Sequence, residues 1–276
     1  MIAGSAVVLA GCGRLDELVY SPPTTPEQWC DERPCTEVGG AVIDEPFGTA
    51  LVALLALAWL ASGLYFLLTR DSQRSRTWLG IAFVLGGIGA AVAGVSYQAF
   101  GYELKCVGYD VCRLTDGWEV AYSVAQAASV SAMLVAVAYA CTSGRLRRGV
   151  VVYAGLNVAV YLVVTALGVL APSSLLLSFE VLMLFAVPGI VLVLVLAARH
   201  ARQAEDPLGR RLVVAAVLLV VVQVAYFGYY AAGIGTSLWD SRGISFTAND
   251  VLHVGMLFWL GYVVRAVGPL LRDATE

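Results

Sequence analysis

Charged residues are scarce in this chain, and lysine and histidine are the scarcest of them. Asp, Glu, Lys and Arg make up 13% of the 276 residues, about half the share of a typical soluble domain, and 59% of the residues are hydrophobic. The sequence also lacks a nucleotide-binding loop, a haem or flavin motif and a Ser-His-Asp order. Because the net charge is only −3 and the basic residues follow a membrane pattern, we expect no nucleic-acid partner.

Seven long apolar segments dominate the chain instead. A helix that crosses a membrane needs roughly 20 apolar residues, and its backbone polar groups must pair within the segment. The sequence therefore predicts an all-α, polytopic seven-helix bundle between an N-terminal segment (residues 1–46) and a short cytoplasmic tail (residues 271–276), with the membrane domain at 47–270. The predicted spans are residues 48–69, 78–99, 118–141, 149–170, 174–198, 212–234 and 249–268.

Arginines alternate between the two sides of this predicted bundle. Ten of the 17 Lys and Arg residues lie in the links after the first, third and fifth segments, and two more lie at the end of the seventh. Positive residues close to spans stay in the cytoplasm. We therefore expect the N-terminus outside and the C-terminus inside.

The cysteines separate by predicted side. Four lie outside, where an oxidising compartment would preserve disulfides, and they are Cys30, Cys35, Cys106 and Cys112. The short-range pairing, Cys30 with Cys35 and Cys106 with Cys112, is favoured, while a bridge between the N-terminal segment and the loop, or four free thiols, stays open.

A further cysteine ends an apolar N-terminal stretch. Leu9-Ala10-Gly11-Cys12 resembles the cleavage and lipidation box of bacterial lipoproteins, which implies lipidation at Cys12. The alternative is an ordinary apolar terminus. We expect a multi-pass protein of a bacterial or archaeal-type plasma membrane, with membrane lipids as its partners.

Polar residues gather at the outer ends of three predicted spans. Tyr122 and Gln126 share one face of the third span with Glu119, and Asn249 shares a face with His253 at the start of the seventh. Polar groups in the membrane usually face the bundle interior, so we expect an outer polar pocket. Its expected lining is Asn249, Gln126, Tyr122, Gln98 and Tyr226.

His253 and its neighbours are the candidates for chemistry. A histidine beside Asp250 could be a metal ligand or a proton-transfer group, or it could simply hold helices together. With Asp250 and Glu119 it could supply one nitrogen and two oxygens to zinc or another divalent metal.

The run Asn249-Asp250-Val251-Leu252-His253 resembles the seventh-helix motif of the membrane hydrolase superfamily of alkaline ceramidases and adiponectin-type receptors (CREST), and Ser96 matches its second-helix serine. Asn249 and Phe100 stand where that family has two of its three metal histidines. The resemblance implies a metal-activated water that attacks a lipid amide or ester, with Ser96 steadying the oxyanion and Glu103 or Asp116 moving protons.

The layout also resembles that of microbial rhodopsins. Arg113-Leu114-Thr115-Asp116 is similar to their entry into the third helix, and Ala225-Tyr226 to a pair in their sixth. Lys105, the single lysine, falls in a predicted outer loop rather than in the seventh span, so we expect no retinal Schiff base. Two hypotheses follow: a metal-dependent lipid hydrolase, or a non-enzymatic sensor, receptor-like or small-ligand-binding protein with the same pocket.

Overall fold

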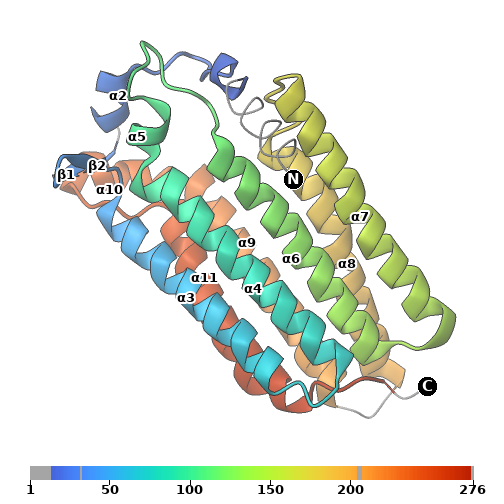
Figure 1. The fold of residues 1–276 in the computed structure, drawn as a ribbon. Helices are drawn as coiled ribbons and strands as arrows, with labels where there is room; N and C mark the ends of the chain where they lie inside the picture. Colours follow the sequence, from blue (N-terminus) through green and yellow to red (C-terminus); the bar gives the residue numbers. More distant parts are fainter. Residues whose placement is uncertain (1–13, 32, 204–206, 275–276) are drawn as a thin grey trace.

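The chain folds into an elongated bundle of seven long helices (Figure 1). The computed structural model describes residues 14–31, 33–203 and 207–274. Each long helix is apolar and long enough to cross a membrane, so the prediction of an all-α polytopic bundle is confirmed. The seven helices are α3 (Pro46–Leu68), α4 (Arg74–Gly94, continued by the π-helical turn η2, Val95–Ala99), α6 (Gly117–Cys141), α7 (Gly144–Leu170), α8 (Phe179–Gln203), α9 (Pro207–Ala231) and α11 (Ala248–Tyr262, continued by η3, Val263–Val267, and η4, Gly268–Leu270).

Four of the seven helices begin four or five residues away from the starts that hydropathy predicts, namely α4, α7, α8 and α9, and two of them show the reason. We expected the fifth span to start at residue 174, but residues 174–177 form a turn and Ser178 Oγ accepts a hydrogen bond from Val181 N at the start of α8. The sixth helix begins earlier than residue 212, at Pro207, a residue that suits the first helical turn. Apolarity locates the part of a helix inside the membrane, whereas caps and prolines set where the helix begins.

Helices α3 and α4 pack closely because small residues lie between them. A Cβ on Gly87 would lie 2.8 Å from Leu60, and one on Gly86 would lie 2.9 Å from the Trp59 ring. The same helices contribute to an aromatic cluster in which Trp59 contacts Phe83 and Trp259 at centroid distances of 4.8 and 5.7 Å. Small residues at an interface bring helix backbones together, so this cluster fixes α3, α4 and α11 against one another.

The described part of the N-terminal segment and two short helices, α5 (Gly101–Lys105) and α10 (Ile234–Arg242), cover one end of the bundle, which we call the disulfide end. The segment contains η1 (Leu15–Glu17), α2 (Pro26–Asp31) and a hairpin of β1 (Thr36–Val38) and β2 (Ala41–Ile43).

Two disulfides are present there, Cys30–Cys35 and Cys106–Cys112, which confirms the short-range pairing. Cys106 and Cys112 pack with Trp29 in a small core, and the backbone amide of Cys112 donates to Thr24 O, so the segment is tied to the link before α6. Cys12, and with it the predicted lipidation, lies outside the described residues.

The opposite end carries the short links and the C-terminal residues, and we call it the arginine end. Asp273 accepts hydrogen bonds from the backbone amides of Arg74 and Ser75 at 2.9 and 2.7 Å, so it caps the start of α4. Arg147 donates to Ala274 O. The described part of the predicted tail is therefore docked on the bundle.

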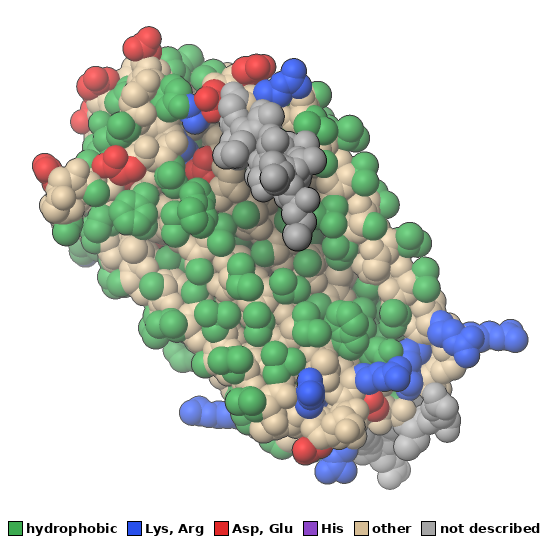
Figure 2. Space-filling model, in the orientation of Figure 1, with side chains coloured by type: hydrophobic (Ala, Val, Ile, Leu, Met, Phe, Trp, Pro, Cys, Tyr) green, Lys and Arg blue, Asp and Glu red, His purple; other side chains and the backbone are tan. Residues whose placement is uncertain are grey.

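Hydrophobic side chains cover the middle of the bundle between these ends (Figure 2). Lys and Arg side chains appear at the arginine end, and Asp and Glu gather with basic residues at the disulfide end. This distribution fits a multi-pass membrane protein. Which end faces the cytoplasm stays the prediction made from the arginine pattern.

Candidate functional site

An elongated cavity of about 460 Å³ runs through the interior of the bundle. Six of the seven long helices line it, and α7 supplies none of the lining residues. On α4 the lining extends from Leu79 near the arginine end to Gln98 at the disulfide end, which corresponds to about 28 Å along the helix axis. The cavity volume falls in the range of small-molecule sites.

The cavity has two chemically different halves. Toward the arginine end its wall is apolar, with Trp59, Trp259, Leu212 and Val267 among the lining residues. Toward the disulfide end the wall carries amide, phenol and imidazole groups. These polar lining residues are Tyr97, Gln98, Tyr122, Gln126, Gln223, Tyr226, Asn249 and His253.

Among the residues that the structure describes, none that lines this cavity is Asp, Glu, Lys or Arg. A charged group moved from water into such a site would lose its hydration without gaining an opposite charge, at a cost of several kcal/mol. The lining therefore selects against molecules that must bring a charge inside. It favours an apolar molecule with an uncharged hydrogen-bonding end.

Short side chains on α4 leave the space for this cavity. Gly86, Ala90 and Ala93 all line it, and their small size leaves the interior space open. Ala91, the neighbour of Ala90, is exposed on the outside of the bundle and does not line the cavity. The small-residue stripe of α4 thus serves both close packing on α3 and the interior volume.

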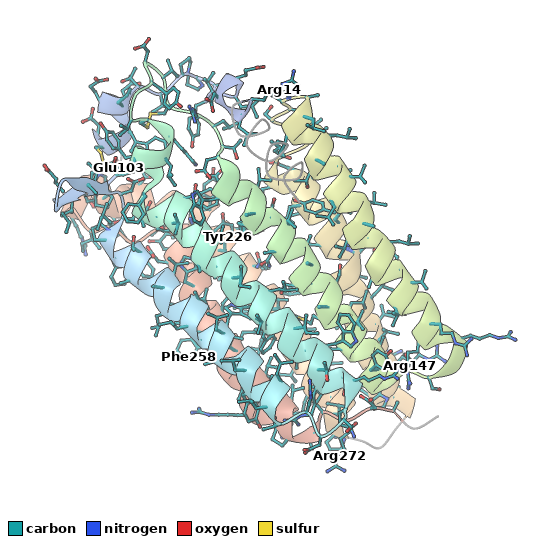
Figure 3. The ribbon with its side chains drawn as sticks, viewed as in Figure 1. Arg14, Glu103, Arg147, Tyr226, Phe258 and Arg272 are labelled. Atoms are coloured by element: carbon teal, nitrogen blue, oxygen red, sulfur yellow. A yellow bond between two sulfur atoms is a disulfide. The ribbon has the colours of Figure 1, made fainter. Side chains whose placement is uncertain are left out.

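All five residues predicted to line a pocket do line this cavity: Asn249, Gln126, Tyr122, Gln98 and Tyr226. Tyr226 lies within the bundle, toward its disulfide end (Figure 3). His253 lines it as well, is 8% exposed, and its Nδ1 has no hydrogen-bond partner among the described residues. A buried polar nitrogen left unpaired costs about 1–3 kcal/mol, so a hydrogen-bonding partner for this Nδ1 would stabilise the protein.

Lys105 is the largest correction to the sequence analysis. We expected it in an outer loop, but it is the last residue of α5, is 2% exposed, and forms an ion pair with Glu119 on α6. Its ammonium also lies 5.1 Å from the centroid of the Tyr97 ring. The adjacent residue, Cys106, is held by its disulfide to Cys112 just before α6, which was the one signal that could have placed this lysine.

Burial lowers the pKa of Lys105, but the charge and hydrogen bond of Glu119 outweigh burial, so the pKa is raised above its usual value. The lysine therefore stays charged, and it neutralises a carboxylate at the entrance to α6. The ion pair therefore holds α5 against α6.

The predicted catalytic residues have structural partners. Ser96 Oγ donates to Asp116 Oδ2 at 2.5 Å and lies 3.2 Å from Glu119 Oε1. Asp116 is also the N-cap of α6 and accepts from the amides of Trp118 and Glu119. Glu103, labelled in Figure 3, accepts from Val42 N and anchors the hairpin. Their contacts fix helix ends.

The predicted metal ligands are not brought together. Glu119 pairs with Lys105, while Asp250 Oδ2 accepts from Thr247 N at 2.7 Å in a capping box at the start of α11. Within residues 14–31, 33–203 and 207–274, no three His, Cys, Asp or Glu side chains are placed to hold a metal ion. The set of His253, Asp250 and Glu119 therefore does not form a three-ligand centre.

A second group of carboxylates lies where the N-terminal segment enters α3. Asp44 is fully buried and accepts from Trp29 Nε1 and from Tyr102 N. Burial raises the pKa of Asp44 despite these bonds. Burial also raises the pKa of Glu45 to about 7; Arg33 opposes this, and the charges of Asp250 and Asp44 add to it. Burial therefore favours the neutral form of both carboxyl groups at the start of α3.

Comparisons with known proteins give a family. A family model described as a family of unknown function (DUF6962) matches residues 49–271, which are the membrane helices. No curated protein matches the chain. Among solved structures the chain is similar to xanthorhodopsin, described as a light-driven ion pump with dual chromophore.

That similarity has 14% sequence identity and a TM-score of 0.39, and it covers 89% of this chain and 92% of the other. At this level the similarity carries no conclusion about the fold or the chemistry of this chain. The resemblance of the seventh span to ceramidases and adiponectin-type receptors gains no support from the comparisons.

Proposed function

The chain belongs to the DUF6962 family, whose function is unknown, and we propose that it is a membrane protein that binds one elongated, uncharged amphiphile inside its helix bundle. This is the non-enzymatic, small-ligand-binding alternative that the sequence left open. The observation that carries the proposal is the 460 Å³ cavity, apolar toward one end and polar without charge toward the other.

The cavity also suggests how the ligand lies. Its apolar chain would occupy the half between α3, α6, α9 and α11, where Trp59, Trp259 and Met256 form the wall. Its hydroxyl or carbonyl end would lie near His253 and Gln126, toward the disulfide end. Burial of the chain supplies most of the affinity, at about 25 cal/mol per Å² of apolar surface.

The metal-dependent hydrolase is the weaker proposal for this site. It needs a centre of three good ligands with an open position for water, and the described residues supply no such His, Cys, Asp and Glu set. Ser96 and Asp116 are engaged with each other rather than directed at the cavity, and neither lines it.

A series of three amphiphiles with the same chain tests the proposal. Native mass spectrometry of the purified protein would be recorded with hexadecanol, hexadecanoate and hexadecylamine at neutral pH. We expect saturable binding of one hexadecanol per chain, with at least about 10-fold weaker binding of the two ionised molecules because the wall has no countercharge. His253→Leu should weaken hexadecanol binding by about 3- to 10-fold, the value of one hydrogen bond.

Equal binding of all three molecules, or binding that never saturates, would show simple partitioning into detergent or lipid and would refute the proposal.

A further inference from the structure

Three oxygen-bearing side chains, two of them buried and one partly buried, meet around Gly48 in the first turn of α3, and the cavity lining does not explain their arrangement. A Cβ built on Gly48 would lie 3.1 Å from Glu45 Oε2 and 3.4 Å from Asp250 Oδ1. It would also lie 3.3 Å from Gln98 Cγ. Three separate segments, namely the entrance to α3, the end of α4 and the start of α11, thus place polar side chains around one small space.

Two of these side chains carry oxygens that lack a partner. Asp250 is 1% exposed and Gln98 is 3% exposed, and neither Asp250 Oδ1 nor Gln98 Oε1 accepts a hydrogen bond from the described residues. The other carboxylate oxygen of Asp250 is used by the capping box with Thr247. Buried acceptors are nearly always paired, so the unpaired Asp250 Oδ1 next to Gly48 indicates a missing positive or hydrogen-bonding species, and the unpaired Gln98 Oε1 belongs to a side chain that also contacts Gly48.

Charge gives the same indication. Neither Glu45 nor Asp250 belongs to the two ion pairs of the described residues, which are Lys105–Glu119 and Arg113–Asp16. Arg33 is the cation whose charge acts on Glu45, but its guanidinium lies over the Trp29 ring at 3.7 Å. Two partly desolvated carboxylates this close together repel each other unless one of them holds a proton or a cation lies between them.

We propose that Glu45, Asp250 and Gln98 form a calcium site around Gly48, at the disulfide end of the bundle. Two carboxylates and an amide oxygen are ligands of a hard divalent cation, and calcium accepts them in irregular geometry with water completing the shell. Glu45 is only partly buried, so the site is reachable from the surface.

The absence of a side chain at Gly48 is part of this site. An alanine there would place its Cβ between the two carboxylates without removing either of them. Gly48 lies in a helix and has no left-handed backbone angle, so alanine fits its backbone. The site adjoins the cavity through Gln98, which lines it, whereas Glu45, Gly48 and Asp250 do not.

Isothermal titration of the purified full-length protein at pH 8 with calcium chloride tests the site, with magnesium and sodium chloride as separate titrants. We expect one calcium per wild-type chain, and at least 10-fold weaker binding in both Glu45→Gln and Gly48→Ala. Gly155→Ala is the matched control, since a Cβ there meets nothing within 4 Å, and it should bind calcium as the wild type does.

The proposal is overturned if the wild type shows no saturable calcium binding, if magnesium or sodium binds in preference to calcium, or if Gly48→Ala binds as tightly as the wild type. Hexadecanol binding measured on the same variants separates the two proposals. A variant that loses calcium binding but still binds hexadecanol has lost the calcium site alone.

Discussion

Replacing Lys105 by Met should destabilise the protein by about 3–5 kcal/mol, the largest loss we expect from any single substitution at the disulfide end. Lys105 and Glu119 are 2% and 8% exposed, so the substitution leaves a buried carboxylate without its countercharge. In thermal unfolding followed by circular dichroism in detergent, Tm should fall on the order of 10 °C.

The second substitution in this experiment removes the orphaned charge. Glu119→Gln alone leaves a buried ammonium and should also be strongly destabilising, whereas Lys105→Met combined with Glu119→Gln should recover at least half of the loss. Arg242→Gln provides the control, because this arginine is an exposed cation at the same end and its removal should change Tm little. A double variant as unstable as the sum of the singles would mean that the pair is not coupled.

Filling the cavity should abolish ligand binding while leaving the fold intact. Ala90→Trp places an indole in the space between α4, α6 and α11, where Ala90 lines the cavity. Binding of hexadecanol should weaken by at least about 20-fold, since the apolar chain loses its buried surface. Tm should stay within a few degrees, because the indole occupies existing space rather than a packed contact.

The next residue in the sequence supplies the control for that result. Ala91 lies on the same helix but is exposed on the outside of the bundle, so Ala91→Trp adds the same side chain on the lipid-facing surface. It should bind hexadecanol as the wild type does. If both tryptophan variants bind normally, or both lose binding, the amphiphile does not occupy the cavity.

The sequence was sufficient for the bundle because membrane spans depend on local composition. Apolar length gave the seven helices within a few residues, and helix periodicity put Tyr122 and Gln126 on the face that lines the cavity. The short-range disulfides were favoured by spacing, because a sequence separation of 6 lets Cys106 and Cys112 meet within one short loop.

The residues that the sequence could not place depend on contacts between distant segments. Lys105 looks like a loop residue until the disulfide loop folds it against α6, and Glu119 looks like a metal ligand until its oxygen receives that ammonium. Glu45 precedes a helix by one residue and has no periodic signal; its proximity to Asp250 arises only when α3 packs beside α11. Local pattern fixes elements and faces, while tertiary packing decides which polar groups meet.

Photolabelling with a hexadecanol that carries a diazirine on its chain, followed by peptide mapping, tests the central claim most directly. We predict that the label attaches to residues that line the apolar half of the cavity, such as Met133 and Met256, and that Ala90→Trp suppresses it. Phe258, which is 76% exposed on the outer surface of α11 (Figure 3), should be labelled only at the background level of lipid. Labelling confined to Phe258 and other outer residues would contradict an interior binding site.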